Sequence, residues 1–144
     1  MSARLSYRIA GWIYVLFAAG HTFGFLTFRP AAADALAVWQ SMQDVRFQSG
    51  GSSFTYGGFY IGFGLSITFF ILFSAFLCCW MSKAGQREPR AVSMLGWALF
   101  VQQVGGLVLS VVYFALPPAI FSAGLTLLLG WAAFQTGRAA QSAI

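Results

Sequence analysis

Four long apolar stretches, almost free of charge, constrain the fold of this chain more than any other feature. They are residues 9–28, 56–80, 91–114 and 118–134. A helix needs about 20 apolar residues to cross about 30 Å of hydrocarbon at a rise of about 1.5 Å per residue. Each stretch approaches or exceeds that length. The sequence therefore predicts one all-α integral membrane domain over residues 1–144, built as a four-helix up-and-down bundle.

The composition argues against a soluble globular protein. Of the 144 residues, 59% are hydrophobic and only 8% are charged, whereas about 25% are charged in a soluble domain. Eight basic and three acidic side chains are too few to cover so much Phe, Leu and Ile in water. Membrane lipid is therefore the expected partner of most of the surface.

The distribution of basic residues predicts an orientation. Six of the eight lie on one side of the predicted spans, namely Arg4, Arg8, Lys83, Arg87, Arg90 and Arg138. On the other side, Arg29 and Arg46 are accompanied by Asp34 and Asp44. The positive-inside rule then places both termini and the 81–90 loop in the cytoplasm. Because membrane orientation accounts for the distribution of the basic residues, the net charge of +5 does not predict a nucleic-acid partner.

The connection between the first two spans is the longest segment outside the predicted bundle, and we expect it to form a long outer loop. Leu36, Trp39 and Met42 recur every three residues, which predicts one short amphipathic helix in the headgroup region. Residues 48–53 contain only Gln, Ser and Gly, a composition that predicts a flexible turn.

Small residues indicate where helices pack. Gly20 and Gly24 are four apart on the first predicted helix, and Gly58 and Gly62 are four apart on the second. Such spacing lets helix backbones approach closely in lipid. The fourth helix is expected to end near Gly137–Arg138, since glycine and a cationic side chain suit a helix C-terminus.

One polar layer is predicted inside the apolar spans. His21 is the only histidine, and a polar side chain in a bilayer faces the protein interior or water and is a candidate functional group. Aligning the helices by depth places it level with Tyr60, with Gln103 or Gly106, and with Ser122 or Thr126. Two interpretations of His21 stay open: a hydrogen bond to a neighbouring carbonyl or hydroxyl, or contact with a ligand or a transferred proton. Gln102 and Gln103 are interpreted in the same way, as side chains that form hydrogen bonds between helices.

Several chemistries lack the residues they need. No carboxylate lies inside any predicted span, so paired-carboxylate catalysis, a di-iron cluster and a carboxylate proton relay lack their donors. A lone histidine cannot supply two haem ligands. Cys78 and Cys79 are adjacent and have no second cysteine pair at zinc-ligand spacing, so they are interpreted as small apolar filler, with reversible acylation as the alternative. No metal and no cofactor are predicted.

Three short motifs resemble an uncharacterised family of small bacterial four-helix membrane proteins. They are Gly20-His21-Thr22-Phe23-Gly24, residues 42–47, and Phe59-Tyr60-Ile61-Gly62-Phe63-Gly64-Leu65. The resemblance covers roughly the first half of the chain. In the family pattern an acidic residue commonly precedes the Phe-Tyr pair, whereas Gly58 stands there in this chain. The resemblance implies the four-span topology and the bacterial inner membrane, and it implies no activity.

Three functions are compatible with these features. The leading hypothesis is binding of a small apolar or lipid-like ligand in the outer half of the bundle, oriented by His21, Tyr60, Gln103 and Thr126. The second is an accessory or assembly subunit of a larger membrane complex, or a homo-oligomer, docking through its glycine faces. The third is a membrane enzyme that uses His21 as acid or base on a lipid-soluble substrate, which predicts activity that changes between about pH 5 and 8. The balance of these features favours a protein that is not an enzyme.

Overall fold

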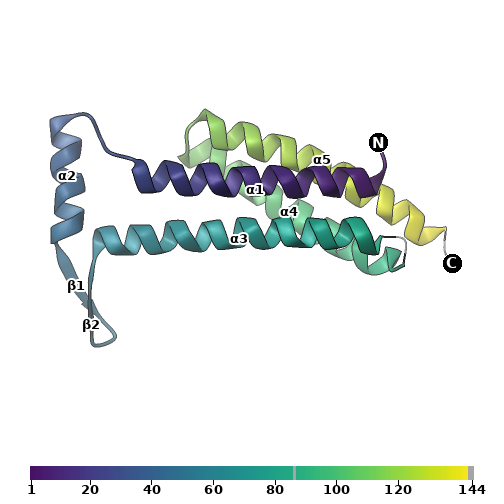
Figure 1. Ribbon diagram of the computed structural model, residues 1–144, viewed down its shortest axis with the longest axis horizontal. Coiled ribbons are helices and arrows are strands. Elements are labelled where there is room, and N and C mark those ends of the chain that lie inside the picture. Colours follow the sequence, from purple (N-terminus) through teal and green to yellow (C-terminus); the bar gives the residue numbers. More distant parts are fainter. Residues whose placement is uncertain (86, 143–144) are drawn as a thin grey trace. The chain divides into compact units, whose positions relative to one another are not determined.

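The computed structural model describes residues 1–85 and 87–142, which form five helices and one two-stranded hairpin (Figure 1). In chain order these are α1 (Ala3–Thr27), α2 (Ala33–Asp44), β1 (Arg46–Ser49), β2 (Ser52–Thr55), α3 (Tyr56–Ala84), α4 (Pro89–Tyr113) and α5 (Leu116–Gln141). The long helices α1, α3, α4 and α5 each have the length and apolar composition needed to cross a membrane. This confirms the predicted helical class with four candidate spans and indicates an integral membrane protein.

Two helices extend beyond their apolar stretches at the ends that carry basic side chains. α1 begins at Ala3 rather than near Ala10, and α3 continues past Trp80 to Ala84. The added turns contain arginine or lysine, whose long stems reach toward water while the backbone stays helical. The hydropathy pattern therefore located the spans but not the full helices.

The end predicted for the last helix is wrong. α5 passes through Gly137 and ends at Gln141, and the N–H of Ser142 bonds to the carbonyl of Arg138. A single glycine costs a helix only about 1 kcal/mol relative to alanine, and the two alanines that follow Arg138 favour continuation. Glycine ends a helix where it adopts a left-handed conformation, and Gly137 does not have a positive φ.

The chain divides into two compact units, and α1 and α3 each contribute a part to both. Unit 1 comprises Met1–Phe17 and the described residues from Ile71 onward, whereas unit 2 is Ala18–Phe70. Unit 1 therefore holds the beginning of α1, the end of α3, and all of α4 and α5. Unit 2 holds the end of α1, α2, the hairpin and the beginning of α3.

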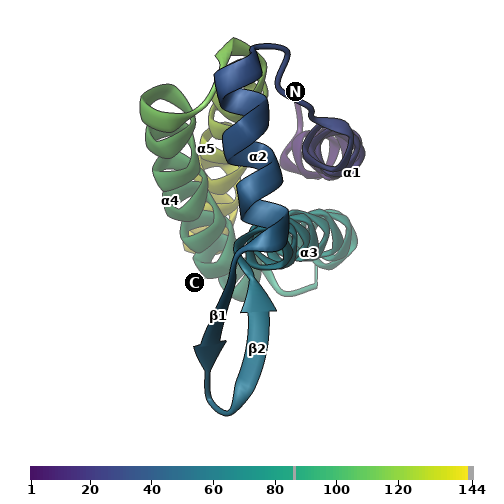
Figure 2. The same cartoon turned by 90° about the vertical axis from the view of Figure 1, so that its left-hand side faces the viewer.

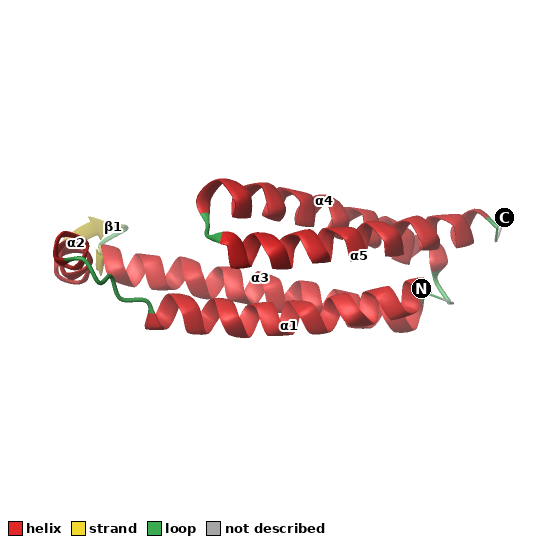
Figure 3. Ribbon diagram, turned by 90° about the horizontal axis from the view of Figure 1, so that it is seen from above, coloured by secondary structure: helices red, strands yellow, loops and turns green. Residues whose placement is uncertain are grey.

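Unit 1 has one densely packed core to which all four long helices contribute. Its buried side chains are Tyr7, Ala10, Tyr14, Ala75, Cys78, Met81, Val92, Leu99, Leu125, Leu129 and Ala132. Within it α4 and α5 lie side by side, joined by a short turn (Figure 3). The packing is close at Gly96, where an added Cβ would collide with the Tyr7 hydroxyl and lie 3.5 Å from the Cα of Ala133. Glycine is needed there because a larger residue has no space.

Unit 2 replaces the predicted outer loop by ordered structure. α2 lies crosswise beyond the end of α1 and the beginning of α3, and the hairpin continues from it (Figures 1 and 2). The short helix expected around 36–42 is confirmed as α2, and the turn expected at 48–53 is limited to Gly50 and Gly51, because the residues on either side pair as strands. β1 and β2 pair antiparallel around Gly50 and Gly51, whose φ angles of 56° and 78° suit the tight two-residue turn of a hairpin.

Candidate functional site

The four residues predicted to orient a ligand are distributed over both units. His21 and Tyr60 belong to unit 2, whereas Gln103 and Thr126 belong to unit 1.

His21 forms part of the contact between α1 and α3 in unit 2. Its Nε2 lies 3.2 Å from the backbone carbonyl of Gly64, which can only accept, so the ring nitrogen donates. One residue further on, the hydroxyls of Thr22 and Thr68 lie 2.8 Å apart. One of the two interpretations of His21 was a hydrogen bond to a neighbouring carbonyl, and the structure contains this bond.

Aromatic rings connect His21 with Tyr60. The His21 ring centroid lies 5.1 Å from that of Phe25, and Phe25 meets the Tyr60 ring edge-on at 6.4 Å. Tyr60 in turn meets Trp39 of α2 edge-on at 5.8 Å. Phe25 fits against α3 because Gly64 has no side chain. A Cβ added to Gly64 would lie 2.7 Å from the Phe25 ring.

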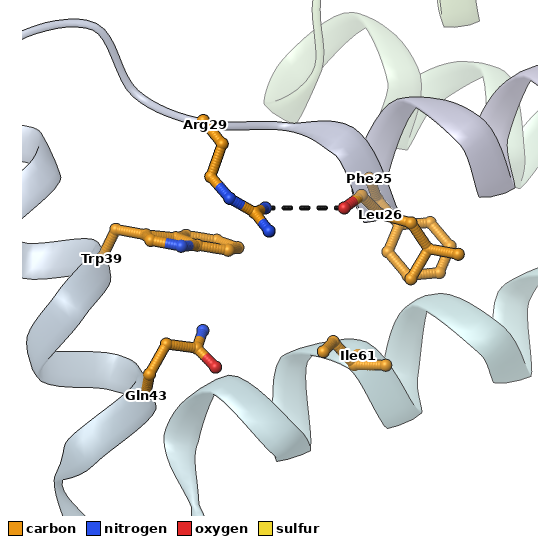
Figure 4. A pocket seen from close by; sticks show the side chains of 6 residues that line it. All are labelled: Phe25, Leu26, Arg29, Trp39, Gln43 and Ile61. Atoms are coloured by element: carbon orange, nitrogen blue, oxygen red, sulfur yellow. Dashed lines mark hydrogen bonds between the residues drawn. The ribbon is translucent and has the colours of Figure 1, made fainter.

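A small pocket opens beside this chain of rings. Its volume is about 170 Å³, and it is lined by Phe25, Leu26, Arg29, Trp39, Gln43 and Ile61. The polar groups of Arg29 and Gln43 lie on the same side as the Trp39 indole, facing the apolar side chains across the space (Figure 4). Phe25, which contacts His21, and Trp39, which contacts Tyr60, are both lining residues. Two of the predicted site residues therefore support the walls of this pocket and do not line it.

Arg29 is the charged group of the pocket. Its guanidinium lies over the Trp39 ring, 5.3 Å from the ring centroid, within the range of a cation–π interaction. Its Nη1 donates to the carbonyl of Phe28 at 2.7 Å and, at the longer distance of 3.5 Å drawn in Figure 4, to that of Leu26. In the described part of the chain Arg29 forms no ion pair. The side chain is exposed, so its charge is screened by solvent.

Gln43 lies against Gly57 at the start of α3. A Cβ added to Gly57 would collide with the side-chain amide of Gln43, so glycine at this position gives the amide its place beside the pocket. Gln43 itself is exposed. The amide therefore borders the mouth of the pocket.

Gln103 and Thr126 belong to a polar network in unit 1. The Tyr14 hydroxyl donates to Gln103 Oε1 at 2.7 Å, and Gln103 Nε2 donates to the carbonyl of Ser122 at 3.4 Å. That carbonyl also accepts from the Thr126 hydroxyl at 2.8 Å, while the Ser110 and Ser122 hydroxyls lie 3.2 Å apart. Every buried side-chain nitrogen and oxygen in the described residues has a hydrogen-bond partner. The network is complete without a ligand.

Tyr14 was not among the predicted site residues, although its spacing from Tyr7 and His21 in the sequence indicates a shared helix face. Tyr7, Tyr14 and His21 are spaced seven apart, nearly two helical turns, and so share one face of α1. Tyr7 pairs with Thr136 at 3.4 Å, Tyr14 with Gln103, and His21 with the Gly64 carbonyl. The sequence also did not predict the grouping of Arg29, Trp39 and Gln43. These side chains come together only because of the path of the chain between α1 and α2, which the spacing of apolar residues does not reveal.

The four glycines predicted for helix packing have open surroundings. A Cβ added to Gly20, Gly24 or Gly62 would meet no other described atom within 4 Å, and at Gly58 it would meet only the Thr55 hydroxyl. The contact between α1 and α3 in unit 2 passes through Gly64 instead.

Other ligand types find little support among the described residues. No group of three or more His, Cys, Asp or Glu there is placed to hold a metal ion. Cys78 is buried and Cys79 is exposed, and both are free thiols.

Comparison with known protein families, curated proteins and solved structures found no match to this chain. The resemblance to small bacterial four-helix membrane proteins therefore stays a prediction.

Proposed function

We propose that the protein binds one end of a small lipid-like ligand in the pocket of unit 2. The observation that carries this proposal is the division of the pocket into two sides. Phe25, Leu26 and Ile61 form an apolar side, while Arg29 and Gln43 bring polar groups to the other. Ligand pockets combine apolar walls with a few polar groups that fix orientation. A lipid-like molecule has the same division along its length.

The size of the pocket favours a partial fit. Its volume of about 170 Å³ is close to that of an engineered cavity of about 150 Å³ that holds benzene. It therefore has room for a headgroup and the first few carbons, or for a single ring. The rest of an alkyl chain would extend past Leu26, which lines the pocket and is exposed, into the surrounding lipid.

His21 and Tyr60 act in this proposal as positioning residues. His21 contacts Phe25 while its Nε2 is held by the Gly64 carbonyl, and Tyr60 contacts both Phe25 and Trp39. They limit the movement of two aromatic walls. Gln103 and Thr126 take no part, because their hydrogen bonds are made within unit 1.

The proposal includes a placement in the membrane. Six of the eight basic residues lie at the ends of the spans that also carry the two chain termini, which favours a cytoplasmic location of both termini. The pocket then lies near the outer surface, at the headgroup level of a bacterial inner membrane. Protease digestion of sealed inverted vesicles tests this, because a tag after residue 142 is predicted to be cleaved there and protected in right-side-out vesicles.

Photo-crosslinking tests the binding itself. The probes are dodecyl phosphate and dodecanol, each with a diazirine on the chain, added to the protein in nanodiscs. At least one probe is expected to label peptides that contain the lining residues. Ile61→Trp fills the pocket and is expected to reduce that labelling severalfold, whereas Ile67→Trp, at an exposed position of the same helix outside the pocket, is expected to leave it unchanged. Equal labelling of both variants contradicts the proposal.

One observation favours assembly as a second function. Gly20 and Gly24 lie four apart on α1, are exposed, and have no other described atom within 4 Å of an added Cβ. A helix from a second copy or from a membrane partner would pack closely on such a face. In native mass spectrometry from mild detergent, Gly24→Leu is expected to abolish any dimer or complex, whereas a wild-type protein that is monomeric and without partners excludes this function.

A further inference from the structure

We infer that the headgroup taken by the unit 2 pocket is anionic, a phosphate or a carboxylate on an alkyl chain. This inference rests on the proposed function and adds the chemical class of the ligand. Arg29 and Gln43 carry it, since they bring a positive charge and a side-chain amide to the same side of one pocket.

The hydrogen-bond donors of Arg29 are only partly used. A guanidinium has five N–H groups and accepts no hydrogen bond. Both hydrogen bonds of Arg29 within the described residues, to the carbonyls of Phe28 and Leu26, are made by Nη1. Nε and Nη2 are left for another acceptor, and a planar guanidinium suits the paired oxygens of phosphate or carboxylate.

Within unit 2, Arg29 forms no ion pair with either of the two carboxylates, Asp34 and Asp44. The Asp34 carboxylate bonds to the N–H of Ala35 at 2.8 Å, and neither Asp34 nor Asp44 lines the pocket. The Trp39 ring below the guanidinium interacts favourably with a cation but does not neutralise it. An anionic headgroup in the pocket would accept hydrogen bonds from the unused donors of Arg29, whereas a cationic headgroup would be repelled by its charge.

The simplest alternative is that Arg29 only caps α1. Its contact with the carbonyl of Leu26, in the last turn of the helix, is typical of a basic residue at a helix C-terminus. Capping does not need the approach of α2, however, whereas Trp39 and Gln43 reach the pocket from that helix. Their presence on the same side as Arg29 favours a binding role in addition to the cap.

The two probes test this inference in nanodiscs made only of zwitterionic lipid. At equal membrane concentrations, dodecyl phosphate is expected to label the lining peptides about fivefold more than dodecanol, as befits a partly exposed charge pair. Arg29→Gln is expected to bring the ratio close to one by lowering the labelling by dodecyl phosphate, and a helical circular dichroism spectrum equal to that of the wild type shows that the variant is folded.

A matched control separates the pocket from the general surface charge. Arg46→Gln removes a cation from the same unit, where Arg46 contacts the Ser53 hydroxyl and does not line the pocket. This variant is expected to keep the fivefold preference, and an equal loss in both variants overturns the inference. Inorganic phosphate in excess is expected to compete weakly, because it lacks the chain; full competition would assign the site to free phosphate instead.

The outcomes also separate this inference from the proposed function. If both probes label the lining peptides equally in the wild type, and Arg29→Gln changes neither, the pocket binds chains without a charge preference and only the inference fails. If neither probe labels those peptides, the proposed function fails.

Discussion

The two units of this chain use polar side chains in different ways. In unit 1 the buried polar groups bond to one another, as Tyr14, Gln103 and Ser122 do. In unit 2 the polar groups Arg29 and Gln43 border a pocket, and the guanidinium has unused donors. Satisfied polar groups hold helices together, whereas groups with spare donors can recognise a ligand. The polar groups of unit 1 therefore have a structural role, whereas those of unit 2 are the ones for which we propose binding.

The largest expected effect tests the close packing of unit 1. Gly96→Ala places a Cβ against the Tyr7 hydroxyl, so we expect the free energy of unfolding to fall by about 1–3 kcal/mol. Gly105→Ala on the same helix has open space around its Cβ and is expected to be neutral or stabilising by up to about 1 kcal/mol. Unfolding in mixed SDS micelles measures both. Two variants of equal stability would show that unit 1 is not tightly packed.

A second variant tests whether the unit 1 network belongs to the ligand site. Gln103→Leu leaves the Tyr14 hydroxyl without its acceptor, and we expect a loss of about 1 kcal/mol with unchanged photo-labelling of the unit 2 pocket. Gln102→Leu, at an exposed position with a bond of 3.4 Å to Ser74, is expected to cost less. If Gln103→Leu abolishes labelling of the pocket in folded protein, Gln103 belongs to the ligand site. The single polar layer predicted from the sequence would then be right.

His21 provides a smaller test within unit 2. His21→Leu removes the bond to the Gly64 carbonyl and the ring contact with Phe25, so we expect about 0.6 kcal/mol lower stability and a twofold to threefold fall in labelling, roughly 0.4–0.7 kcal/mol. Thr22→Val breaks the neighbouring bond to Thr68, with a similar cost in stability, but is expected to leave labelling intact. Equal labelling by both variants would remove the positioning role of His21.

The smallest effect concerns the mouth of the pocket. Gly57→Ala displaces the exposed Gln43 amide, which can move, so stability is expected to change by less than about 0.5 kcal/mol. The preference for dodecyl phosphate over dodecanol is expected to weaken about twofold, because the amide leaves its place beside the headgroup. Gly62→Ala, with open space around it, is the control, and an identical preference in both variants would exclude Gln43 from the site.

The sequence predicted the spans because hydropathy and helix length are properties of single segments. It also predicted α2, since the spacing of Leu36, Trp39 and Met42 is local. The hairpin was missed, because composition alone was taken to mean flexibility, although two adjacent glycines between short strands are typical of a tight turn.

The candidate site was predicted only in part. His21 and Tyr60 were identified from their type and depth, and both contact residues that line the pocket. The depth alignment could not show that Gln103 already has Tyr14 as its partner, since that depends on how each helix is rotated about its axis. Nor could it show that Arg29 meets Trp39, because that contact depends on the turn between α1 and α2.

The hairpin turn offers a reporter position for the sidedness of the membrane. Its tip is exposed, but Gly50 and Gly51 adopt positive φ angles that other residues tolerate poorly, so a thiol is better introduced beside them. Ser52→Cys places one next to the bend, with Cys78 and Cys79 replaced by serine to silence the background. Maleimide dyes that do not cross the bilayer would then reveal which compartment this tip occupies in living cells.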